Sequence, residues 1–256
     1  MNVFAALVLA CCAPAAALGQ WAKVPAPKVP RTPAGQVDLH APAPRTPDGK
    51  PDLTGPWSSD DNRYARDFAL EMKPEEVPHL PWSREVLQSR KDGAHSAEDP
   101  DAHCLPQGVP KIGALAYPWK MVRTGNSYVV IYEAFTLWRQ IFTDGREVEA
   151  DAQPTWMGYS TGHWEGDEFV VETRGFNGRI WLDQLGRPTT EKMRVTERFR
   201  RVDFGNMTID VTVDDPGAYT KPLHAHQEVH LTPGWEPLEF ICAENNKDVE
   251  HLPGRK

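Results

Sequence analysis

The sequence predicts a mainly β protein whose antiparallel meander closes into a barrel. From Ala116 onward, short segments alternate apolar and polar residues, which places successive side chains on opposite faces of a strand. Turn pairs such as Asp144-Gly145 and Pro233-Gly234 separate these segments and are typical of hairpins. Because closure removes exposed strand edges, a meander of this length is expected to form a barrel.

The expected strands lie near residues 117–123, 127–133, 137–143, 156–164, 168–174, 192–202, 207–214, 223–231 and 238–243. The clearest hairpin joins 156–164 to 168–174 through the turn Glu165-Gly166-Asp167. In its second strand, Phe169 and Val171 share one face and Glu168 shares the other with Glu172.

The sequence divides into three parts. Residues 1–19 are predicted to be a signal peptide, residues 20–51 form a proline-rich leader, and residues 52–256 form one barrel domain. The leader is expected to be extended and weakly packed. Trp57 is a candidate for a first strand, although Pro56 is awkward in a paired strand. One short helix is expected from Trp82 to Lys91, because Pro81 opens it and Asp92-Gly93 ends it.

The N-terminus predicts export to the periplasm or secretion. The apolar run from Val3 to Ala10 is too short to span a bilayer, and Ala17-Leu18-Gly19 fits a signal-peptidase site. A lipid-anchored Cys11 or Cys12 is the alternative. Beyond this segment the sequence indicates no stable membrane span.

Cleavage after residue 19 leaves Cys104 and Cys242 as the remaining cysteines. In an oxidising compartment these two most simply form a disulfide that ties the segment before the barrel to its last strand. Two buried free thiols are the alternative.

The chain carries a net charge of −8 and has an isoelectric point near 5.6. Nucleic acids and anionic membranes both need a basic surface, so neither is an expected partner. A small-molecule ligand or substrate is expected instead.

Glu197 is the first candidate for chemistry. It shares a strand face with Val195 and Phe199, and a carboxyl group in apolar surroundings is a candidate general acid or base. The alternative is a structural ion pair with Arg139, which also points to an apolar face.

The histidine-rich strand 223–231 is the second candidate. His224, His226, Glu228 and His230 project from one face, so His224 and His226 are candidate ligands of a divalent metal ion. Because the opposite face is apolar, the alternative is that these histidines simply face water.

Aromatic residues are the third candidate. A ligand-binding wall is expected from five of them: Trp119, Trp138, Trp156, Trp181 and Tyr219. Large core side chains are the alternative. The long connection 175–190 is predicted to be a lid or a strap, and Asp183 within it is a candidate to orient His163.

Several short motifs also occur together, among them Asp52-Leu53-Thr54-Gly55, Cys104-Leu105-Pro106, Pro118-Trp119-Lys120, Thr155-Trp156-Met157-Gly158, Gly162-His163-Trp164-Glu165-Gly166-Asp167, Trp181-Leu182-Asp183 and Asp214-Asp215-Pro216. With these motifs the chain resembles a large group of exported bacterial proteins, mostly of uncharacterised function. The resemblance covers residues from Pro51 to the C-terminus and implies a lipocalin-like barrel. It supplies no catalytic residues.

The leading functional hypothesis is an exported enzyme that acts on a small aromatic or hydrophobic molecule, for example a lignin-derived phenylpropanoid. Acid–base chemistry of the lyase or isomerase type is expected, with Glu197 and His163 as acid and base and Tyr132 and Arg139 as polar anchors. Phosphate-binding, nucleophile-elbow and dinucleotide motifs are missing, and no cofactor is expected. The alternatives are a non-catalytic ligand-binding protein and a metal-binding protein that uses the His224 strand.

Overall fold

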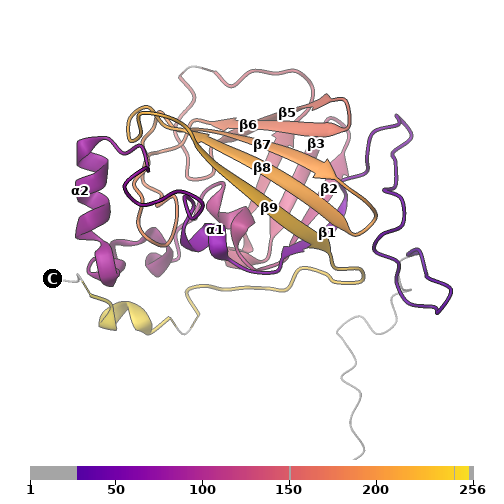
Figure 1. The fold of residues 1–256 in the computed structure, drawn as a ribbon, viewed down its shortest axis with the longest axis horizontal. Coiled ribbons are helices and arrows are strands. Elements are labelled where there is room, and N and C mark those ends of the chain that lie inside the picture. Colours follow the sequence, from indigo (N-terminus) through magenta and orange to yellow (C-terminus); the bar gives the residue numbers. More distant parts are fainter. Residues whose placement is uncertain (1–27, 150, 245, 254–256) are drawn as a thin grey trace, which may run out of the picture.

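The computed structural model describes residues 28–149, 151–244 and 246–253, and it contains a closed nine-stranded barrel (Figure 1). The strands are β1 (Gly55–Ser59), β2 (Trp119–Thr124), β3 (Ser127–Tyr132), β4 (Trp138–Phe142), β5 (Tyr159–Glu165), β6 (Glu168–Arg174), β7 (Arg194–Arg201), β8 (Asn206–Asp214) and β9 (Leu223–Leu231). Each strand pairs with the next, and β9 pairs with β1. The predicted mainly β barrel is therefore confirmed. The proposed signal peptide lies outside the described residues.

Eight of the nine expected strands are present, but the ninth was wrong. Residues 238–243 form no strand, and β1 occupies the place between β2 and β9 instead. Trp57 of β1 is fully buried, and Pro56 is accommodated opposite Lys120. Once β1 and β9 have paired, the barrel has no place for another strand between them.

The meander is antiparallel except at one junction. β4 and β5 run parallel and pair only at Ile141 with Ser160 and at Phe142 with Thr161. The expected tight turn at Asp144-Gly145 does not lead directly into the next strand, because β4 ends at Phe142 and β5 begins only at Tyr159. A parallel pair requires such a return connection.

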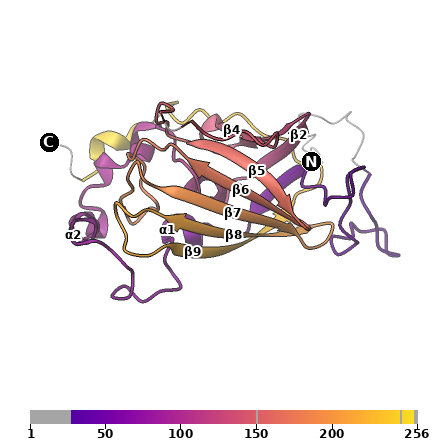
Figure 2. The ribbon, with the colours of Figure 1, turned by 90° about the horizontal axis from the view of Figure 1, so that it is seen from above.

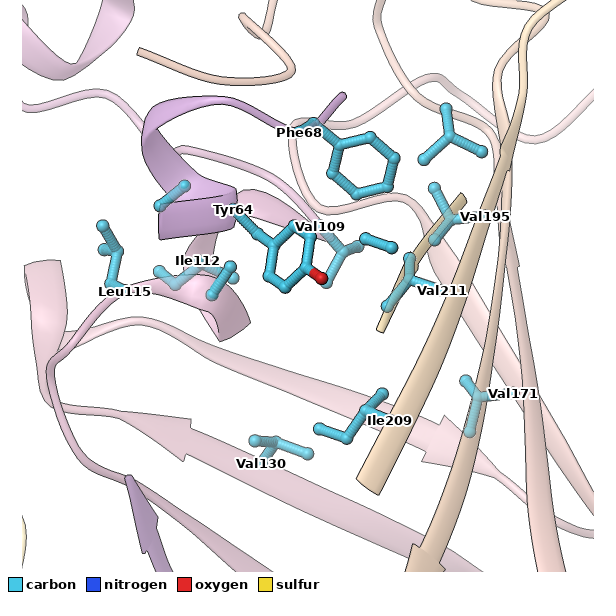
Figure 3. Packing of buried hydrophobic residues seen from close by; sticks show 14 of the residues in the cluster. Tyr64, Phe68, Val109, Ile112, Leu115, Val130, Val171, Val195, Ile209 and Val211 are labelled. Atoms are coloured by element: carbon cyan, nitrogen blue, oxygen red, sulfur yellow. The ribbon is translucent and has the colours of Figure 1, made fainter. Parts of the chain in front are cut away.

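Strand alternation sets which side chains enter the barrel. Val195, Glu197 and Phe199 of β7 are buried, whereas His224 and His226 of β9 are exposed on the outer face. A short helix, α1 (Arg63–Arg66), packs over one end of this core. Figure 3 shows Tyr64 of α1 and Phe68 beside Val109 and beside apolar strand residues, among them Val195, Ile209 and Val211.

The one helix that was predicted, from Trp82 to Lys91, is present as α2 (Pro81–Ser89), with Pro81 in its first turn. It lies outside the barrel, at the end opposite the described part of the leader (Figures 1 and 2). The connection 175–190 packs at the α2 end, where Arg90 donates to the Gly186 carbonyl at 2.7 Å and Gln184 N–H donates to the Ala65 carbonyl at 2.9 Å. The connection is therefore a strap that these hydrogen bonds hold against the rest of the fold.

Cys104 and Cys242 form the predicted disulfide, with their sulfurs 2.13 Å apart. Cys242 lies in the segment after β9 and not on the last strand, which corrects the expected attachment point. Within the described residues, no helix combines the length and apolar composition that a bilayer crossing requires.

Candidate functional site

Inside the barrel, the strands bring Glu197 and Arg139 together. Arg139 Nη1 donates to Glu197 Oε2 at 2.7 Å, and the two side chains are only 3% and 7% exposed. Tyr132 is also buried, and this burial raises the pKa of its hydroxyl to about 12. The ion-pair alternative for Glu197 therefore describes the observed geometry.

His163 is not brought to Glu197. It lies on β5 with 57% of its side chain exposed, and its Nε2 is 3.1 Å from Glu165 Oε1. Because Glu197 points into the barrel, the expected acid–base pair lies on opposite sides of the sheet.

Asp183 does not orient His163, which corrects that hypothesis. It is fully buried, accepts a hydrogen bond from Phe68 N–H at 2.9 Å and pairs with Arg187. The connection that carries Asp183 leaves β6 at the end opposite the β5–β6 turn, so it cannot fold over the hairpin tip beside His163.

The five aromatic residues of the expected wall do not share one cavity. Trp119 is buried in the core, Trp138 is 64% exposed, and the Trp156 ring packs under the Arg179 guanidinium at 5.3 Å. Trp181 lines a cavity beside α2, and Tyr219 donates to the Pro188 carbonyl at 2.9 Å nearby.

The histidines of β9 contact neighbouring strands individually. His226 Nδ1 lies 2.6 Å from Asp210 Oδ1, and His224 Nδ1 lies 3.1 Å from the Thr212 hydroxyl. Among the described residues, no group of three histidine, cysteine or acidic side chains is placed to hold a metal ion. The observed outward face matches the alternative in which these residues face water.

The cavity beside α2, which we call the barrel-end cavity, has a volume of about 750 Å³. Three segments far apart in the sequence form it: residues 67–79, residues 84–99 and the strap at 181–187. Its apolar wall includes Val77, Leu87, Trp181 and Leu185, and its charged wall includes Asp67, Glu75, Arg84, Arg90, Lys91, Asp92, Asp99 and Arg187.

His79 gives this cavity a neutral imidazole. Burial, together with the nearby Arg187 and Arg84 charges, lowers the pKa of His79 to about 4. Its Nδ1 lies 2.8 Å from the hydroxyl of Ser83 on α2, whereas its Nε2 has no hydrogen-bond partner. The Ser83 hydroxyl thus holds the His79 ring at Nδ1, whereas Nε2 on the other side of the ring lacks a hydrogen bond.

Arg187 is the second unsatisfied group in the cavity wall. Its Nη1 binds Asp67 at 2.6 Å and also contacts Asp183, but its buried Nε has no hydrogen-bond partner. The two carboxylates hold the guanidinium in one orientation. The Arg187 Nε–H donor is therefore held at a fixed position.

A cation–aromatic stack completes the wall. The Arg90 guanidinium lies 4.0 Å from the centroid of the Trp181 ring. Gly186 lies directly against Arg90, because a Cβ at this position would meet Arg90 Cδ at 2.7 Å. Because glycine has no Cβ, the strap packs directly against the Arg90 side chain, which follows α2.

Sequence reasoning missed His79 and Arg90. His79 lies in a polar, proline-broken stretch without a strand or helix pattern, and Arg90 lies in the predicted helix, where nothing marks it as a site residue. The length of the connection 175–190 was the one signal that pointed to this end of the molecule.

No protein-family model matches the chain, and a comparison with curated proteins finds no match. The barrel fold implied by the resemblance is confirmed by the structure, whereas membership of the exported bacterial group stays a prediction.

Proposed function

We propose that this protein binds a small molecule in the barrel-end cavity. The observation that carries the proposal is the pair of unsatisfied nitrogens, His79 Nε2 and Arg187 Nε, on two buried side chains that both line the cavity. A buried polar group without a partner destabilises the protein by roughly 1–3 kcal/mol, and a ligand that supplies the partner removes this penalty. The volume of about 750 Å³ lies within the usual range of ligand sites.

The wall indicates the chemistry of the ligand. Arg187 Nε always carries a proton, so it requires a hydrogen-bond acceptor. Val77, Leu87 and Trp181 add apolar and flat surface. The ligand class is therefore a small molecule with an apolar or planar part and a carbonyl, phenol or carboxylate oxygen.

The structure favours ligand binding over a reaction in which Glu197 and His163 act as acid and base. The Glu197 carboxylate is held by Arg139, and His163 lies on the other side of the sheet. The lyase or isomerase hypothesis is tested separately, by measuring how fast the Glu197→Gln variant turns over a confirmed substrate.

The binding proposal is tested with 8-anilinonaphthalene-1-sulfonate, whose flat rings and sulfonate oxygens match the wall. We expect saturable fluorescence enhancement with native protein and competition by ferulic acid, a planar phenylpropanoid. Leu87→Trp places a larger side chain in the cavity wall and should weaken binding strongly, whereas Leu238→Trp, at an exposed leucine outside it, should not.

His79→Phe keeps a flat ring but removes Nε2, so it should weaken binding by roughly tenfold. Equal binding by Leu87→Trp and Leu238→Trp, or no binding by native protein, would overturn the proposal.

A further inference from the structure

The described part of the leader contains a tandem repeat. Residues 30–39 read PRTPAGQVDL and residues 44–53 read PRTPDGKPDL. We call these segments the first hairpin and the second hairpin. The leader was predicted to be extended, but each repeat folds back on itself through an isolated antiparallel bridge, Arg31 with Val37 and Arg45 with Pro51.

The two hairpins share their arginine hydrogen bond and their backbone turn bonds. Arg31 Nη1 donates to the Gly35 carbonyl at 2.7 Å, and Arg45 Nη1 donates to the Gly49 carbonyl at the same distance. The turn bonds also match, since Gly35 N–H and Gly49 N–H each donate to a threonine carbonyl at 2.8 Å. Both glycines have a φ of 79°, which glycine adopts readily. The repeat is therefore one structural unit made twice.

The second hairpin shows what this unit binds. Its Arg45 forms a two-pronged ion pair with Asp167 of the β5–β6 turn, at 2.6 and 3.0 Å. Lys50 donates to the Gly166 carbonyl of the same turn at 2.9 Å, and Asp48 pairs with Arg123 of β2. The planar guanidinium fits a carboxylate through two parallel bonds, which gives the contact geometric specificity.

The first hairpin is attached to the barrel by its base. Leu39 O accepts from Gly205 N–H and Ala41 O accepts from Phe204 N–H, both at 2.7 Å, at the β7–β8 turn. The side chains of the tip are exposed, and within the part of the chain that the structure describes Arg31 forms no ion pair. Arg31 thus makes the same hydrogen bond within its hairpin as Arg45 does, but among the described residues it has no carboxylate partner.

We propose that the first hairpin is a docking site for a partner protein that presents an acidic glycine turn, the kind of turn that Gly166-Asp167 presents to the second hairpin. Arg31 holds the carboxylate, and the Gln36 amide donates to the turn carbonyl as Lys50 does. Ala34 replaces Asp48, so the partner needs no basic residue equivalent to Arg123.

A second copy of this chain is not the native occupant, because its own Arg45 already holds its Asp167. This point also provides the test. The variant Arg45→Ala/Lys50→Ala vacates the turn while the first hairpin stays intact. We expect concentration-dependent dimers of this variant in sedimentation experiments, at concentrations where the native chain shows none.

Adding Arg31→Ala to that variant should restore the monomer, and so should Asp167→Asn. The exposed Arg63→Ala is the matched control and should leave the dimer intact. A vacated-turn variant that stays monomeric up to about 1 mM, or a dimer that survives Arg31→Ala, would overturn the proposal.

A second experiment asks whether the first-hairpin sequence binds the turn within one chain. Asp48→Ala, Lys50→Gln and Pro51→Val together give the second hairpin the sequence of the first. In this background, the double-mutant cycle between Arg45→Ala and Asp167→Asn should retain a coupling of about twofold to fivefold in the unfolding equilibrium constant. Loss of the coupling, with the native cycle positive, would show that the first-hairpin sequence cannot hold such a turn.

Discussion

Removing Arg139 from the barrel core should destabilise the protein strongly. Arg139 and Glu197 are 3% and 7% exposed, and 2.7 Å separates their paired atoms. Arg139→Met keeps most of the side-chain volume but leaves the Glu197 carboxylate in the core without a counter-ion. Breaking one partner of a buried pair costs about 3–5 kcal/mol, so we expect a loss of this size in the free energy of unfolding.

Replacing both partners should be far less harmful. Arg139→Met/Glu197→Leu removes both charges, and apolar replacements of similar size are often neutral or stabilising by roughly 1–4 kcal/mol. The double variant should therefore be more stable than Arg139→Met alone, with a large favourable coupling in the double-mutant cycle.

The assay is urea unfolding at pH 7, followed by tryptophan fluorescence and far-ultraviolet circular dichroism with the disulfide intact. Coincident transitions by the two probes are required before free energies are compared. A loss below about 1 kcal/mol for Arg139→Met, or additive losses in the double variant, would refute the view that this pair is shut off from water.

Two further predictions concern pH and the disulfide. The pKa of His79 falls from 6.5 in its ordinary state to about 4 on folding, so the stability due to neutral His79 is complete above pH 6.5 and is lost as pH falls through 4. Between pH 7 and pH 4, native protein should therefore lose up to about 3 kcal/mol more of its free energy of unfolding than His79→Asn, an upper limit because solvent screening reduces the effect. Parallel pH curves for native protein and His79→Asn would contradict this. Replacing Cys104 and Cys242 together by serine opens a link that spans 138 residues and should lower the free energy of unfolding by about 3–5 kcal/mol, which urea titration measures. An unchanged urea midpoint would contradict the expected contribution of the disulfide.

The candidate site was much less accessible to sequence reasoning than the fold. Alternation along residues 194–201 places Glu197 correctly among apolar side chains, because a strand face is a local property of two-residue spacing. Whether Glu197 meets Arg139 or His163 depends on which strands face each other across the barrel. No local sequence pattern marks His79 as a site residue, because it becomes part of a cavity only through the segments that meet it at the α2 end of the fold.

The sequence by itself determined the mainly β class, most strand positions, the α2 helix and the disulfide partners, since alternation, turn residues, an initiating proline and the number of cysteines are local or countable features. Only the tertiary structure decided that Gly55–Ser59 closes the barrel, that β4 and β5 run parallel, and that residues 67–79, residues 84–99 and the strap line one cavity. Local patterns fix which face of a segment is apolar. Which distant segments meet depends on the paths of the connections and on barrel closure, and these follow from the packing of the whole chain.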